Sequence, residues 1–116
     1  MGSEMCIRDS ISGDGASASA NAYVSNSFAY PLGNLGGSGL AANIYTPAVI
    51  DVLDYQNTNK NKTIRAFGGY DANGSGQLYF SSSAWYNTAA ITSITLGSSV
   101  GKLTSASQLA LYGIKG

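Results

Sequence analysis

The chain has 116 residues with six basic and six acidic side chains, so its formal net charge is zero, and 44% of its residues are hydrophobic. That length allows one domain with a modest core. A neutral chain without histidine lacks the basic surface that a nucleic-acid-binding protein uses to neutralise phosphates, which argues against that class. Glycine, serine and asparagine interrupt every apolar run before the roughly 20 residues of a transmembrane helix, which argues against membrane insertion.

Residues 1–9 do not resemble the rest of the chain in their residue pattern. Read through the genetic code, Gly2–Asp9 resembles a transposase-based sequencing adapter whose last bases would begin the codon of Ser10. We therefore expect residues 1–9 to be a non-native adapter-derived segment and residues 10–116 to be the C-terminal part of one domain. The alternative is a genuine N-terminus. Without the segment the chain loses Cys6, its single cysteine, so neither a disulfide framework nor a cysteine metal site is expected.

The elements predicted along the chain are strands, because β-branched and aromatic residues alternate in short runs and no stretch has a convincing helical period. They are Ala22–Tyr30, Ala48–Tyr55, Lys62–Phe67, Gln77–Trp85, Ala90–Leu96 and Gln108–Ile114. Asn73-Gly74 lies between two of them and is a strong hairpin signal. The last strand is apolar on both faces, which predicts a central, covered position.

Short strands with Gly and Asn turns are typical of a sandwich or barrel. The predicted fold class is therefore all-β, an antiparallel β-sandwich that is incomplete if its upstream part is missing. The residues expected in its structural core are Ile50, Val52, Trp85, Ile94, Leu96, Leu109, Leu111 and Tyr112.

Three motifs in order carry a family resemblance: YQNTNKNKT at 55–63, AWYNTAAITSI at 84–94 and LYGIKG at 111–116. This pattern resembles a segment of bacteriophage virion structural proteins and spans about residues 48–116. The resemblance implies a jelly-roll-like module in a tail, fibre or capsid-surface protein. In that family further strands precede the module, and the family has no settled ligand.

Catalysis is not expected. Acid–base chemistry usually needs histidine or a pair of carboxylates, and residues 10–116 contain no His, Cys or Glu. Asp51 and Asp54 would point to opposite faces of a strand. A glycosidase pair of Asp54 and Asp71 is an alternative supported by residue type alone. No cofactor is expected, and no metal, since a calcium loop opening at Asp71 would have Ser82 where a bidentate Glu belongs.

The ligand-binding prediction rests on position only. Tyr70, Asp71 and Asn73 lie near a loop tip, where binding residues tend to be found. Trp85 could stack on a sugar but is more typical of a core residue. The basic cluster Lys60, Lys62 and Arg65 is interpreted as a solvated loop leading into an edge strand, where lysines block unwanted pairing.

The sequence thus predicts a non-catalytic bacteriophage virion protein that packs through uncharged β surfaces as a homo-oligomer or with other virion subunits, with weak recognition of host-surface glycans at exposed loops. Its expected location is the virion. The alternative is a carbohydrate-binding module detached from a larger enzyme, or a bacterial adhesin, located extracellularly or at the cell surface.

Overall fold

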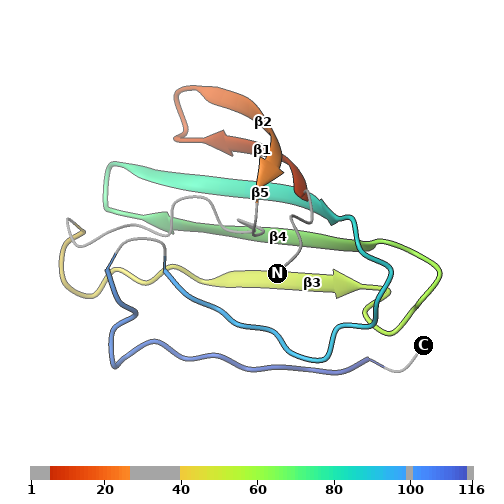
Figure 1. Ribbon diagram of the computed structural model, residues 1–116. Helices are drawn as coiled ribbons and strands as arrows, with labels where there is room; N and C mark the ends of the chain where they lie inside the picture. The colour runs from red at the N-terminus through yellow and green to blue at the C-terminus, as the bar shows by residue number, and fades with distance from the viewer. Residues whose placement is uncertain (1–5, 27–39, 99–100, 115–116) are drawn as a thin grey trace.

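The computed structural model describes residues 6–26, 40–98 and 101–114, and these contain strands and no helix, as an all-β fold requires. The strands are β1 (Cys6–Gly13), β2 (Ala18–Asn26), β3 (Ala48–Leu53), β4 (Lys62–Asp71) and β5 (Gly76–Trp85). They form one five-stranded sheet in the order β2-β1-β5-β4-β3, shown in Figure 1. Every neighbouring pair is antiparallel, which confirms the predicted fold class.

The hairpin of β4 and β5 forms where Asn73-Gly74 predicts it. Both residues have positive φ, 57° and 103°, and the N–H of Ala72 donates to the carbonyl of Ser75 at 2.7 Å. These are the features of a type I′ turn, whose twist matches that of the flanking strands. The turn sets the register of the whole hairpin, with Asp71 opposite Gly76.

Strand β1 was not predicted, because residues 1–9 were set aside as adapter-derived and the residues that follow are small and polar. It nevertheless pairs with β2 on one side and β5 on the other; Cys6, Arg8 and Asp9 take part in both pairings, with a register irregularity between Cys6 and Arg8 on the β2 side. The adapter origin of residues 1–9 stays a prediction. The expected strand Ala22–Tyr30 corresponds to the second half of β2, and its residues 27–30 lie outside the described part.

The sheet has two unlike faces. In β4 the side chains of Lys62, Ile64 and Ala66 are buried or half-buried, whereas those of Arg65 and Phe67 are exposed, as the alternation in the sequence predicts. We call the face with Ala66 the inner face and the face with Phe67 the open face. Register pairing with β4 and β5 then assigns the paired residues of the other strands, from Arg8 onward, to one face or the other.

The centre of the inner face is small and polar. Ser10, Ser81 and Ala66 lie opposite one another across β1, β5 and β4, and all three are buried, as is Ser83. Ala66 is the single buried hydrophobic residue in the part of the chain described. A sequence reading that looks for large apolar side chains misses such a centre, because serine and alanine are typical of loops as well.

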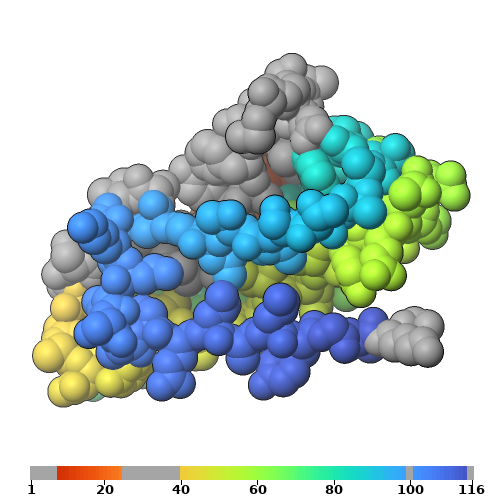
Figure 2. All heavy atoms as spheres, turned by 60° about the horizontal axis from the view of Figure 1, so that its bottom comes forward, coloured from red at the N-terminus to blue at the C-terminus, as the bar shows by residue number. Residues whose placement is uncertain are grey.

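The chain after β5 makes two extended passes. Residues 86–98 run back along the sheet and residues 101–114 return beside them in the opposite direction, as both Figure 1 and Figure 2 show. The first pass lies over the inner face, where residues 90–94 adjoin Val52, Ile64 and Trp85. The arrangement is sandwich-like: the hydrogen-bonded sheet forms one layer, and the first pass lies over its inner face.

The predicted strands at 90–96 and 108–114 are wrong for the described residues, in which neither segment joins a ladder. The central position expected for the last segment is also wrong. Within the described residues no layer covers the passes from outside, and most of their large apolar side chains are exposed. The core predictions that fail for this reason are Ile94, Leu96, Leu109, Leu111 and Tyr112, whereas Ile50, Val52 and Trp85 are half-buried on the inner face.

Two alanine substitutions distinguish the exposed residues from the half-buried ones. Leu111 is 84% exposed, so Leu111→Ala should change the free energy of unfolding by less than about 0.5 kcal/mol. Ile50→Ala removes a half-buried side chain opposite Ala66 and should cost about 1–2 kcal/mol, less than a fully buried residue would. Urea unfolding of both variants measures the difference. A larger loss at Leu111 would show that its segment is packed in solution.

Candidate functional site

The hairpin tip does not assemble the predicted ligand site. The Asp71 carboxylate accepts a hydrogen bond from the N–H of Asn73 at 2.8 Å, which gives both residues a role in the turn itself. Tyr70 is half-buried on the inner face opposite Gln77, whereas Asp71 is exposed on the other face. The structure therefore brings Asp71 and Asn73 together and directs Tyr70 away from them.

The carboxylates do not pair either. Asp54 follows β3 at the end where β4 begins, and Asp71 ends β4. The ten residues of β4 separate them by about 30 Å at the rise of a strand, beyond the roughly 5–9.5 Å of a glycosidase pair. In the described residues, no group of three or more His, Cys, Asp or Glu side chains could hold a metal ion.

Lys62 is the most deeply buried large side chain of the described chain, with 0% exposure. Its ammonium donates to three backbone carbonyls: Asn57 at 2.6 Å, Lys60 at 2.8 Å and Thr88 at 3.0 Å. These bonds tie the β3–β4 loop to the chain that leaves β5. The N–H of Ile91 donates to the carbonyl of Tyr55 at 2.8 Å and adds a second tie between the same segments.

This position corrects the interpretation of the basic cluster. Lys62 is not solvated, and β4 lies between β5 and β3 rather than at an edge. Only Lys60 and Arg65 are exposed, and Arg65 forms an ion pair with Asp51 of β3 at 3.5 Å on the open face. No signal in the sequence marks this position, because the acceptors that a buried ammonium needs are here backbone carbonyls.

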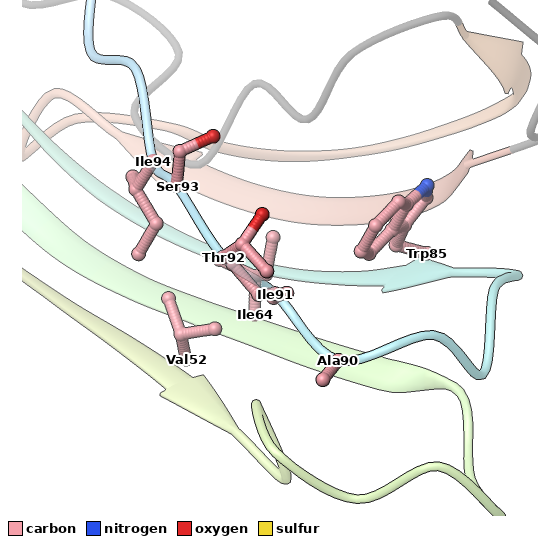
Figure 3. A pocket seen from close by; sticks show the side chains of 8 residues that line it. All are labelled: Val52, Ile64, Trp85, Ala90, Ile91, Thr92, Ser93 and Ile94. Atoms are coloured by element: carbon pink, nitrogen blue, oxygen red, sulfur yellow. The ribbon is translucent and has the colours of Figure 1, made fainter.

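A shallow apolar groove lies between the first pass and the inner face, as Figure 3 shows. Val52, Ile64 and Trp85 form its floor, and residues 90–94 form its other side. None of its lining side chains is charged, and Thr92 and Ser93 supply its only hydroxyl groups. The groove is therefore suited to packing rather than to chemistry.

A line of exposed apolar side chains crosses the open face of the sheet. Val49, Phe67, Phe80, Ile11 and Ala20 lie directly opposite one another in register across all five strands. We call this line of side chains the apolar row. Phe67 and Phe80 are 53% and 49% exposed, and Val49 and Ile11 are exposed further. An exposed row of apolar side chains is a candidate interaction site, because contiguous apolar patches on a protein surface often mark one.

The turn between β1 and β2 contains a carboxyl group whose pKa is shifted. Asp14 accepts hydrogen bonds from the N–H of Ser17 at 2.7 Å and of Ala16 at 3.0 Å, and these hold the pKa of its carboxyl below 3.8. The carboxylate form therefore stabilises the turn, fully above pH 3.8 and progressively less as the pH falls through the lower folded-state pKa.

An NMR titration tests this pH dependence. The amide shifts of Ala16 and Ser17 should follow the protonation of Asp14 with a midpoint below pH 3.8, since both amides bond the Asp14 carboxylate. In the Asp14→Asn variant, which has no carboxyl to protonate, the same shifts should not respond to acid. A midpoint at or above pH 3.8 would contradict the hydrogen bonds.

Comparisons of the chain with models of known protein families, with curated proteins and with solved structures found no match. In the described residues, no helix is long and apolar enough to cross a membrane.

Proposed function

We propose that this chain is a non-catalytic structural component of a bacteriophage virion, in the tail, a fibre or the capsid surface. Its work is assembly, through packing of β surfaces against other subunits. The observation that supports the proposal is the apolar row on the open face, which an antiparallel sheet presents to solvent along its full width. The motifs at 55–63, 84–94 and 111–116 resemble virion proteins and supply the biological setting.

Assembly has more support than ligand recognition. The tip residues Asp71 and Asn73 are engaged in their own turn, and the groove beside Trp85 has no charged side chain with which to orient a sugar. Exposed β surface with few charges instead favours contact between proteins. Glycan recognition stays a secondary part of the proposal, at the loops.

The decisive experiment is resequencing of the open reading frame across residues 1–10, together with its neighbouring genes. Phage tail or head genes beside it, and the protein in the mass spectrum of purified virions, are the expected results. A catalytic domain in the same reading frame would overturn the proposal in favour of a carbohydrate-binding module. A secretion signal with no phage genes nearby would favour an adhesin.

A further inference from the structure

We propose that the open face is a homodimer interface, in which two copies pack face to face about a two-fold axis that runs along β5. This inference deepens the proposed function, on which it rests for the idea that β surfaces build an assembly. It commits to one partner, a second copy of this chain, and to one arrangement. Three observations select them: the area of the face, the distribution of large and small side chains, and the positions of its charges.

The area is sufficient. Five strands about 4.8 Å apart and roughly eight residues long give a face of about 24 by 26 Å, or near 600 Å² from each copy. The total of about 1,200 Å² reaches the lower bound of specific, stable interfaces. Sheets that pack in this way lie about 10 Å apart, with their strands within about 30° of each other.

The outer strands of the face differ in the size of their side chains. Val49 and Phe67 lie on β3 and β4, whereas Ala20 and Ala22 of β2 leave a shallow hollow beside Ile11. A two-fold axis along β5 exchanges the two halves, so that β4 of one copy lies over β1 of the other and β3 lies over β2. Val49 of each copy then lies over Ala20 of its partner, and Phe67 lies over Ile11 at the edge of the hollow.

The charges select the same axis. Arg65 of β4, Ser82 of β5 and Asp9 of β1 occupy one line of the register on the open face. With the axis along β5, Arg65 of each copy faces Asp9 of the other, which gives two reciprocal ion pairs. An axis between β4 and β5 would instead place Asp51 over the other copy's Asp9 and bring like charges together. The apolar contacts use residues 11–80 and do not depend on the origin of residues 1–9, whereas the Arg65–Asp9 pairs belong to the chain as its sequence is given.

Sedimentation equilibrium of the full chain at micromolar concentration should show a dimer. Phe80→Asp places a charge on the axis, at the centre of the interface, and should weaken dimerisation by at least about 30-fold. Leu111→Asp makes the same kind of change at an exposed residue outside the open face and should leave the dimer unchanged. A monomeric wild-type chain, or equal effects of the two variants, would overturn the proposal.

Two further measurements do not depend on Phe80→Asp folding correctly. Ser82 lies on the axis, so Ser82→Cys in a Cys6→Ser background should give a dimer with a short bis-maleimide, whereas Ser105→Cys should not. Arg65→Asp should weaken the dimer, and adding Asp9→Arg should restore it. Crosslinking at Ser105 alone, or no restoration by the charge exchange, would exclude this axis.

The two proposals fail in distinguishable ways. A monomer in solution would overturn the dimer while the genomic setting still supported a virion protein. A dimer with the predicted crosslink, in a gene that lies beside no phage genes, would retain the interface and overturn the virion function.

Discussion

Replacing Lys62 with methionine is expected to lower the free energy of unfolding by about 2–4 kcal/mol. Three hydrogen bonds from an ammonium would each contribute about 1.5–3 kcal/mol, and the cost of burying the charge, several kcal/mol, offsets part of that sum. Methionine has nearly the same length and no charge, so the variant leaves the carbonyls of Asn57, Lys60 and Thr88 without their donor. The loss measures what the ammonium contributes beyond packing.

Lys60→Met is the matched control, because it makes the same substitution two residues away at an exposed side chain. It should change stability by less than about 0.5 kcal/mol. Urea unfolding followed by the fluorescence of Trp85, the single tryptophan, measures both variants and reports on the groove next to the Lys62 contacts. Equal stability of the two variants would mean that water, rather than the carbonyls, solvates the Lys62 ammonium.

Lys62 also illustrates why its place could not be predicted from the sequence. A lysine is almost never fully buried unless it is partnered, and its partners here are backbone carbonyls from a loop and from a segment 26 residues away. No pattern of residue types encodes a carbonyl acceptor, since every residue has one. The sequence therefore predicts a solvated lysine, and only the tertiary structure reveals its three acceptors.

Local signals were sufficient for the strands between residues 48 and 85. The β-branched run of β3, the alternation in β4 and the Asn73-Gly74 turn each act through neighbouring residues, and the structure contains all three. The same kind of signal failed at 108–114. An apolar run becomes a central strand only if partner strands exist on both sides, and in the described residues this segment has none.

Which residues come together on the open face also could not be predicted from the sequence. The alternation in β4 places Phe67 on one side of its strand, but the sequence does not say that Phe80, Ile11 and Val49 join it in a single line. That line depends on strand order, and β1, which lies between β5 and β2, was not predicted at all. The candidate site therefore emerges from register rather than from any motif.

Gly69→Ala is expected to destabilise the chain by about 1–3 kcal/mol, the usual cost of forcing extra atoms into a packed position. A Cβ on Gly69 would lie 2.5 Å from the carbonyl oxygen of Gln77 and 2.9 Å from Cδ2 of Leu78. The oxygen belongs to the backbone of β5 and cannot rotate away as a side chain could, so β4 and β5 would have to separate next to their turn.

Gly97→Ala is the control for this substitution, since no atom lies within 4 Å of the added Cβ, and it should change stability by less than about 0.5 kcal/mol. Thermal unfolding of the two variants gives the comparison. Because β4 and β5 also align Phe67 with Phe80, Gly69→Ala should weaken the dimer as well as the fold, whereas Gly97→Ala should affect neither. If Gly69→Ala matched its control in both measurements, the close approach of the two strands would not exist in solution, and the alignment on which the dimer depends would have to be redrawn.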